Sequence, residues 1–519
     1  MFLLTLFYFI TRLPFLRNLP VFYDSFEYLG LAEKLTISNF SQLTSSSHQP
    51  IHTFYFLTVL VFKTMFFFLP ANTVLVLISF VFGYLTITVW YWLVRNYFDK
   101  KIAFYSSLLI LFFPYFFAAN TNILYESELL FFQIVSLYFI FKGLKENKYF
   151  FIILAGVFWG ISQSIFIGSL LIFPIFFGQL MKIKNKKLAS LMTFLLIGTI
   201  TTIIIDVLFL KSSVYFKYQS HFFDFVSSSD GFFIFLLRII RNIGIQTIAI
   251  LSVSGAMALI ISLLILFIKN KKEFLTCLIW LVPTFILMQY WHAGLFSRLA
   301  LFIIFPASLV ISLAMKRKII KLFVLFSIAL TTINYVIKQR QEPPMYRYNS
   351  LIKNSIDSSK MAMITSDYNR FLYLKNKTPT FIFNGLNENI IQAEKFILDN
   401  LNQQKKVLID SSGLRFPYFQ FDGDFYHVLS LGKIGQSQAK KVLERFNFQT
   451  YKVDRKNPEI YFLEITGISK TKEEIKLKAF YPRVTYKINR NKSYSYDLFT
   501  NIYYFLARKK DPEYWWYEK

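Results

Sequence analysis

The sequence has few cysteines and few acidic residues, and both scarcities limit what the protein can be. Its 519 residues include one cysteine, Cys277, which excludes a disulfide framework and a metal site built from cysteines. Asp and Glu total 30 against 57 Lys and Arg, a formal net charge of 57 − 30 = +27. Such a surplus is typical of nucleic-acid-binding proteins, so the distribution of the positive charges along the chain decides its meaning.

The sequence also lacks a repeat of fixed period and a low-complexity tract. We do not expect the first apolar run to be a cleavable signal peptide, since no basic residue precedes it and no small-residue cleavage site follows it. Apolar residues are abundant instead. Hydrophobic residues make up 55% of the chain, 63 residues are Phe, and the mean hydropathy is +0.44. A soluble domain is about 45–50% apolar, and a disordered chain has low hydrophobicity. The composition therefore predicts a membrane protein.

The apolar runs lie in residues 1–337, whereas residues 338–519 have an ordinary globular composition. A membrane-spanning helix needs about 20 apolar residues. Candidate spans are 2–18, 74–94, 102–119, 128–142, 149–165, 166–181, 188–210, 244–268, 274–290, 299–315 and 321–337. We therefore predict a polytopic α-helical membrane domain with eleven transmembrane helices over 1–337, and a second domain over 338–519.

Most basic residues of the membrane part lie in five short connections between spans. These connections are 95–101, 142–148, 182–187, 269–272 and 316–321. Loops rich in Lys and Arg stay in the cytoplasm, and the five fall on one side only if the apolar run 51–69 does not cross. We interpret 51–69 as a helix in the outer interface, with the N-terminus inside and 338–519 extracytoplasmic. The charge is then topological, and no nucleic-acid partner is expected.

The scarce acidic residues of 1–337 gather on the predicted outer face. Those outside or at its boundary are Asp24, Glu27, Glu33, Glu126, Glu128, Asp224 and Asp230, and Asp206 lies near the outer end of its span. A carboxylate near the membrane is costly unless it is solvated or paired. We therefore expect the functional site on the outer face.

Each acidic motif has a structural explanation beside the functional one. Asp24 could cap a helix that begins near Ser25, with Glu27 completing a capping box. Glu126 and Glu128 at the start of a helix suit the helix dipole. The residues alone leave both alternatives open.

Several motifs of the first 60 residues follow one another in a distinctive order. The first span ends in Arg-Leu-Pro-Phe at 12–15, and an Asp-x-x-x-Tyr motif follows from Asp24 to Tyr28. Ala-x-x-Leu stands at 32–35, and a His-x-Pro turn at 48–50 leads into the aromatic interfacial segment.

Farther along come an acidic outer loop at 120–128, a Gly-rich stretch at 155–160 and Arg298 before an apolar, proline-containing span. This order resembles the GT-C membrane glycosyltransferases. The most similar families are the dolichyl-phosphate-mannose protein mannosyltransferases and the bacterial aminoarabinose transferases of lipid A. The resemblance covers about residues 1–337.

The resemblance implies roles for the acidic residues and their neighbours. Asp24 matches the first-loop aspartate, the catalytic base, although Ser25 stands where the family often has a second acid. Tyr28 matches the tyrosine that often follows. Glu126 or Glu128 matches the acid of the second loop, and the spacing does not choose between them.

The resemblance also implies a phosphate-binding group. His48 matches a turn residue before the interfacial helix, and Arg298 matches a late outer arginine that meets the lipid phosphate. Lys63, Arg238 and Arg241 are further candidates, with snorkelling or binding of lipid headgroups as the alternative. The two arginines are three apart and share one face if their segment is helical.

The implied reaction transfers a sugar from a polyprenyl-phosphate donor to a glycan, lipid or protein acceptor on the outer side, with inversion. One alternative is a glycan polymerase or ligase that uses a diphosphate-linked donor, and another is a lipid or glycan transporter. A divalent metal could bind among Asp24, Glu126, Glu128, His48 and His52, but the close spacing of metal motifs is absent, so no cofactor is assigned. An AT-rich composition is compatible with a bacterial plasma membrane.

Residues 338–519 alternate short strands and helices, which favours a small, partly parallel α/β sheet. Expected strands are 360–366, 380–383, 406–410 and 459–465, and expected helices are 389–404 and 436–446. This part of the chain has no nucleotide-binding loop and no hydrolase motif.

Overall fold

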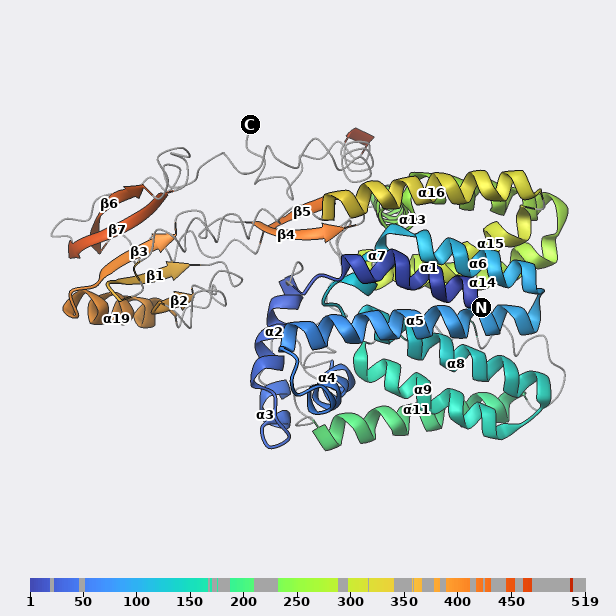
Figure 1. The fold of residues 1–519 in the computed structure, drawn as a ribbon, viewed down its shortest axis with the longest axis horizontal. Coiled ribbons are helices and arrows are strands. Elements are labelled where there is room, and N and C mark those ends of the chain that lie inside the picture. Colours follow the sequence, from blue (N-terminus) through green and yellow to red (C-terminus); the bar gives the residue numbers. More distant parts are fainter. Residues whose placement is uncertain are drawn as a thin grey trace. The chain divides into compact units, whose positions relative to one another are not determined.

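The structure is a computed structural model (Figure 1). It describes residues 1–18, 23–45, 52–166, 169, 175, 187–209, 232–287, 297–315, 317–339, 357, 359–365, 378–382, 389–410, 417–422, 425–430, 445–452, 461–468 and 505–506. The chain divides into two compact units. The first comprises Met1–Arg340, Asp422–Phe425 and Tyr494–Lys509, and the second comprises Gln341–Phe421, Tyr426–Ser493 and Lys510–Lys519.

The described elements of the first unit are helical, in agreement with the apolar runs. In chain order they are α1 (Phe2–Arg12), η1 (Leu13–Phe15), α2 (Tyr23–Lys34), α3 (Phe40–Ser45), α4 (Thr53–Met65), α5 (Ala71–Tyr97), α6 (Lys100–Phe112), α7 (Pro114–Thr121), α8 (Glu126–Glu146), α9 (Tyr149–Ile165), α11 (Lys187–Phe209), α13 (Phe232–Lys269), α14 (Lys271–Leu287), η4 (Ser297–Ile303), α15 (Ile304–Ala314) and α16 (Lys318–Gln339).

Four described helices are long and apolar enough to cross a membrane: Ala71–Tyr97, Glu126–Glu146, Ala189–Val207 and Ile239–Lys269. The helices α6 and α7 together count as a fifth candidate, but they are bent by 70°. The bend falls where Pro114 begins α7, because proline suits the first turn of a helix and disrupts its interior. The predicted span 102–119 is therefore broken.

The helix α4 supports the separate treatment of segment 51–69. It has 13 residues, which at 1.5 Å per residue is about 20 Å, shorter than the hydrocarbon core of about 30 Å. Its location in the outer interface stays a prediction. The count of eleven spans also stays a prediction, since most of 166–181 lies outside the described residues.

The Gly-rich stretch of α9 lies where α9 packs against α11 (Figure 1). A Cβ atom at Gly160 would stand 2.4 Å from the main-chain oxygen of Gly198, and one at Gly198 would stand 2.2 Å from the ring of Trp159. Trp159 in turn stacks on Phe194, with ring centroids 4.7 Å apart. The glycines allow this close approach, because any side chain there would push the two helices apart.

We expect Gly160→Ala to destabilise the protein by about 1–3 kcal/mol, since the added methyl group meets backbone that cannot yield. Gly143→Ala in α8 is the matched control. Its Cβ would stand 2.8 Å from the far end of the Ile152 side chain, which can shift, and 3.2 Å from the main-chain nitrogen of that residue. Alanine also favours a helix over glycine by about 1 kcal/mol. Thermal unfolding in detergent, followed by intrinsic fluorescence, should show a lower midpoint for Gly160→Ala only. Equal midpoints for both variants would contradict the packing account.

The arginine of the Arg-Leu-Pro-Phe motif is fully buried and joins α1 to α6 and α7. Its guanidinium donates a hydrogen bond to the main-chain oxygen of Leu111. It also lies over the rings of Phe117 and Tyr8, at 4.9 Å and 5.3 Å from their centroids. Arg12 therefore fixes the end of the first helix against the connection that leads toward α8.

The second unit contains a five-stranded mixed sheet with the strand order β2-β1-β3-β7-β6. Its elements are β1 (Met361–Thr365), β2 (Thr380–Ile382), α19 (Asn389–Asn402), β3 (Lys406–Asp410), β6 (Phe446–Lys452) and β7 (Tyr461–Ile468). β1 pairs in parallel with β2 and β3, and β7 pairs antiparallel with β3 and β6. Ala393 and Ile397 of α19 pack against Ala362, Ile364 and the neighbouring apolar residues of the sheet.

The sequence pattern missed three strands of this part of the chain. β4 (Pro417–Asp422) and β5 (Phe425–Ser430) form a separate two-stranded sheet. The expected helix 436–446 falls mostly outside the described residues, and its last residue, Phe446, begins β6. A single buried aromatic residue at the end of an element fits both the helical period and the strand period. The sequence pattern therefore did not distinguish a helix from a strand at Phe446.

Candidate active site

The two acidic residues of the second predicted loop are deeply buried. Glu126 and Glu128 lie in the first turn of α8 and are 1% and 0% exposed. The predicted loop 120–127 is shorter than expected, because α7 continues to Thr121 and leaves only 122–125 between the two helices. The acids thus belong to the packed end of the helical unit rather than to a solvated loop.

The helix α4 supplies the polar groups that face these acids. The Thr58 hydroxyl donates a hydrogen bond of 2.7 Å to Oε1 of Glu128, whose Oε2 has no partner among the described residues. The Tyr55 hydroxyl is buried and likewise lacks a partner within the described ranges. Burial, followed by the charges of Glu128 and Glu126, raises the pKa of Tyr55 well above its ordinary value. Tyr55 therefore stays protonated and can donate a hydrogen bond.

An aromatic cluster lines the same region and brings together α2, the start of α4 and the connection between α7 and α8. Tyr28 of α2 lies edge-on to the rings of His52, Tyr55 and Tyr125, with centroid distances of 5.8, 5.5 and 6.0 Å. His52 packs on Tyr125 at 4.1 Å. All four side chains are at most 1% exposed. The predicted site residue Tyr28 therefore lies beside the segment that carries Glu126.

Serine hydroxyl groups hold the connection between α7 and α8 in place. Ser25 of α2 donates to the main-chain oxygen of Ile123 at 2.6 Å, and Ser79 of α5 donates to that of Leu124 at 2.7 Å. Ser127 donates to Oδ1 of Asn120 at 2.8 Å. Ser25 follows Asp24 directly in the first turn of α2, and Ile123 lies three residues before Glu126. The Ser25 hydrogen bond therefore ties the turn that carries Asp24 to the segment that carries Glu126.

Asp24 itself lies inside α2, which begins at Tyr23. The expectation that Asp24 caps a helix beginning near Ser25 is therefore wrong, since the helix starts two residues earlier. Tyr28 follows one turn later, which is the spacing of one helix face. The side chain of Asp24 lies outside the described atoms, so its role stays a prediction.

Lys63, one of the predicted phosphate-binding residues, contacts the end of α2. Lys63 donates hydrogen bonds to the main-chain oxygens of Ala32 and Leu35 at 2.6 and 3.0 Å. This contact satisfies carbonyls at the end of α2, which need a cation or another donor. It gives Lys63 a structural role and does not support a phosphate role.

The predicted arginines lie on two helical elements. Arg238 and Arg241 are both in α13, so their segment is helical, and the buried Arg241 donates from Nε to Oδ1 of Asn242 at 3.2 Å. Arg298 lies in η4, which packs against α7 and α8. The side chains of Arg238 and Arg298 and the whole of His48 lie outside the description.

Tyr55 and Thr58 were not identified as site residues from the sequence, and His52 was identified only as a possible metal ligand. They lie at the start and on one side of a strongly apolar segment, Thr53–Met65. Tyr55 and Thr58 are three residues apart and therefore share a helix face. Polar residues at that spacing within an apolar helix were the available signal. Thr53 of the same helix lies beside Asp206 of α11, which is itself buried.

His52 has an unusual protonation state. Burial lowers its pKa to about 4, and the main-chain oxygen of Ile165, which accepts a hydrogen bond from Nδ1, opposes this shift only in part. The imidazole is therefore neutral at pH 7, with the proton on Nδ1. Its contribution to a phosphate site at neutral pH would be that of a neutral group and not of a cation.

The lowered pKa of His52 predicts a pH-dependent stability. The unfolded chain binds a proton near pH 6.5, whereas the folded chain binds it near pH 4. Stability is then lost as the pH falls from about 6.5 to 4, by up to about 3 kcal/mol. The unfolding midpoint should drop less with acidification for His52→Gln than for the unmodified chain between pH 7.5 and 5. Identical slopes would contradict the assignment.

A divalent metal site was considered from the sequence. No group of three or more His, Cys, Asp or Glu side chains comes together among the residues that the structure describes. The two remaining candidates, the Asp24 side chain and His48, are not among them. The described acids alone do not form a metal site.

Residues 48–209 match the family profile described as dolichyl-phosphate-mannose-protein mannosyltransferase. No curated protein sequence matches the chain. The fold is similar to that of ArnT from Cupriavidus metallidurans bound to undecaprenyl phosphate, with a TM-score of 0.52 and 12% identity over 83% of this chain and 97% of that chain.

A second similar structure is the Archaeoglobus fulgidus oligosaccharyltransferase in complex with Zn and sulfate. Its TM-score is 0.50, with 13% identity over 80% of this chain and 68% of that chain. The resemblance to the GT-C glycosyltransferases is thereby confirmed, and so is a helical membrane architecture with at least four candidate spans.

Proposed function

We propose that the chain is an inverting glycosyltransferase that moves a sugar from a polyprenyl-phosphate donor to an acceptor on the outer face of the membrane. The observation that carries the proposal is the buried pair Glu126 and Glu128 beside the anchored first turn of α2, which holds Asp24. Carboxylates are rarely buried so completely unless they are paired, and buried ionisable groups are concentrated at functional sites. The undecaprenyl phosphate named for the Cupriavidus structure supports a lipid-phosphate donor.

The proposed reaction is one displacement at the anomeric carbon. An acceptor hydroxyl attacks that carbon, the bond to the phosphate oxygen breaks, and the lipid phosphate leaves with the electron pair. Asp24 takes the proton of the acceptor hydroxyl. A phosphate monoester is a good leaving group, so the protein needs positive charge near the phosphate more than an acid, and Arg298 on η4 is the candidate for this charge.

The described residues have supporting roles in this scheme. Thr58 orients Glu128, and the Tyr55 hydroxyl offers a donor that no described protein group uses. In this scheme the Glu128 carboxylate and the Tyr55 hydroxyl contact hydroxyl groups of the sugar. Tyr28 and His52 provide a closed aromatic wall. We place catalysis in residues 1–337 and propose that 338–519 is an extracytoplasmic domain that faces a glycan, lipid or protein acceptor.

The proposal is tested by supplying prenyl-phosphate sugars, both hexosyl and pentosyl, to the purified chain in lipid nanodiscs with a mixed set of acceptors. Release of free prenyl phosphate, followed by mass spectrometry, is expected for at least one donor. A nucleotide sugar is the matched control, and it should give no product. Turnover of the nucleotide sugar in place of the lipid-linked donors would overturn the proposal.

A further inference from the structure

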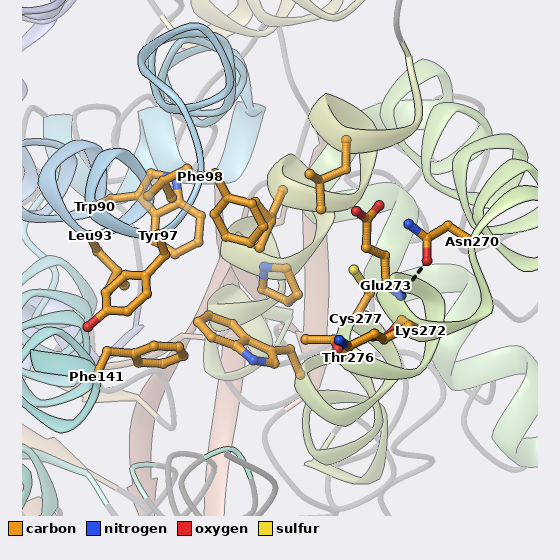
Figure 2. Close-up of a pocket in the computed structure, with 15 residues that line it drawn as sticks. Trp90, Leu93, Tyr97, Phe98, Phe141, Asn270, Lys272, Glu273, Thr276 and Cys277 are labelled. Carbon is orange, nitrogen blue, oxygen red and sulfur yellow. Dashed lines mark hydrogen bonds between the residues drawn. The ribbon is translucent and has the colours of Figure 1, made fainter. Parts of the chain in front are cut away.

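A pocket lies away from the candidate active site, between the C-terminal end of α5 and the start of α14. Its volume is about 470 Å³, within the range of about 300–1,000 Å³ of ligand sites. Figure 2 shows Trp90, Tyr97 and Phe141 on one side and Asn270, Lys272 and Glu273 on the other. The acids of the candidate active site are at the opposite end of α8 from Phe141.

The inner wall of this pocket is apolar and aromatic. Trp90 and Trp280 are 0% and 4% exposed, and their ring centroids are 6.2 Å apart. Phe141 lies 5.7 Å from Trp280 and 4.9 Å from Tyr97. Pro306 of α15 completes the wall. Apart from the buried indole N–H of Trp90, which has no partner among the described residues, this wall is apolar and fits a hydrocarbon chain.

The pocket lies at the C-terminal end of the candidate span α5, where a membrane-spanning helix would meet the lipid headgroups of one leaflet. Trp90 and Tyr97 are seven residues apart on α5, which is about 10 Å along the helix axis, and Tyr97 is the last residue of this candidate span. Tyr and Trp side chains gather at the membrane–water interface. The pocket therefore reaches from the headgroup level toward the hydrocarbon core.

The rim carries one charge of each sign. The Lys272 side chain is exposed and that of Glu273 is half-buried, and neither makes an ion pair with another described residue. Asn270 accepts a hydrogen bond from the main-chain nitrogen of Glu273 at 3.2 Å and so fixes the start of α14. A free phosphate would meet only one of the two charges, whereas a zwitterionic headgroup would meet both.

We propose that this pocket binds a membrane phospholipid with an ethanolamine headgroup. The phosphate lies at Lys272, the ammonium lies at Glu273, and one acyl chain enters between Trp90, Trp280 and Phe141. The ammonium group can also donate hydrogen bonds to the Glu273 carboxylate, which a choline headgroup cannot do. The site is independent of the proposed sugar transfer.

The single cysteine of the chain provides a direct reporter, because Cys277 lines the pocket, is buried and is the one thiol in the sequence that can be labelled. The rate of its labelling by N-ethylmaleimide is measured in a neutral maltoside detergent with added dioleoyl phosphatidylethanolamine or dioleoyl phosphatidylglycerol. We expect phosphatidylethanolamine to slow the labelling at lower concentration than phosphatidylglycerol. Native mass spectrometry of the same samples counts bound lipid directly.

Two charge variants and one matched control complete the test. Glu273→Gln should weaken phosphatidylethanolamine binding about fivefold and remove the preference over phosphatidylglycerol, and Lys272→Gln should weaken binding of both lipids. Lys271→Gln, next to the pocket but not lining it, should leave binding unchanged. Equal binding of the two lipids by the unmodified chain, or a Glu273→Gln effect no larger than that of Lys271→Gln, would overturn the proposal.

Discussion

Asp24→Asn is expected to slow sugar transfer about 10²- to 10⁴-fold, which is the usual contribution of a general base. The amide has nearly the same size and remains on the anchored first turn of α2, but it cannot accept the proton of the acceptor hydroxyl. The fall should appear in kcat with little change in donor KM, because the base acts on the acceptor at the transition state. Initial rates of prenyl phosphate release provide the measurement.

The matched control for this variant is Glu33→Gln, which makes the same chemical change at an exposed position of the same helix. Its rate should equal that of the unmodified chain. Unchanged turnover in Asp24→Asn would remove Asp24 as the base and leave the buried acids of α8 as the only acidic candidates among the proposed residues.

Glu128→Gln is the second substitution with a large expected effect. We expect it to lower turnover and to leave stability unchanged or raise it. The change keeps the size of the side chain and an oxygen that accepts the Thr58 hydrogen bond. It replaces the second carboxylate oxygen with an NH2 group, so the side chain can no longer carry a negative charge. We expect turnover to fall about 10²-fold or more, as for the loss of one preorganised charged group. Stability should stay the same or rise, because a buried carboxylate with an unsatisfied oxygen is costly.

Thr58→Val separates the hydrogen bond from the charge. It removes the donor to Glu128 but keeps the carboxylate, and a hydrogen bond to a charged group contributes about 1.5–3 kcal/mol, so turnover should fall about tenfold or more. The unfolding midpoint should fall as well, since Glu128 then lacks its described partner. If Glu128→Gln lowered stability and left turnover unchanged, Glu128 would be a structural residue and not part of the site.

Part of this structure could be predicted from the sequence because hydrophobic length and period carry the information. The expected spans 74–94 and 149–165 coincide closely with α5 and α9. Expected strands such as 406–410 coincide with strands of the second unit. The pattern could not separate α6 from α7, because the break at Phe113 depends on one proline within a continuous apolar run.

The candidate site was less accessible to sequence reasoning, because its geometry depends on contacts between distant segments. Glu126 and Glu128 were identified by their charge, but the hydrogen bond to Glu128 comes from Thr58, which is 70 residues away along the chain. The rings of His52 and Tyr125 are in contact although 73 positions separate the two residues. No local pattern encodes such a pairing. The contact of Lys63 with the end of α2 likewise appears only when the helices are packed.

The most direct test of the central claim is a choice between two donors. The purified chain in nanodiscs receives the same sugar linked to a polyprenyl monophosphate or to a polyprenyl diphosphate, with a shared acceptor mixture. Mass spectrometry then identifies the released lipid. We expect release of polyprenyl monophosphate from the first donor, a product with inverted anomeric configuration, and loss of this activity in Asp24→Asn. Consumption of the diphosphate donor alone would contradict the account and indicate a polymerase or ligase, and no consumption of either donor would indicate a transporter.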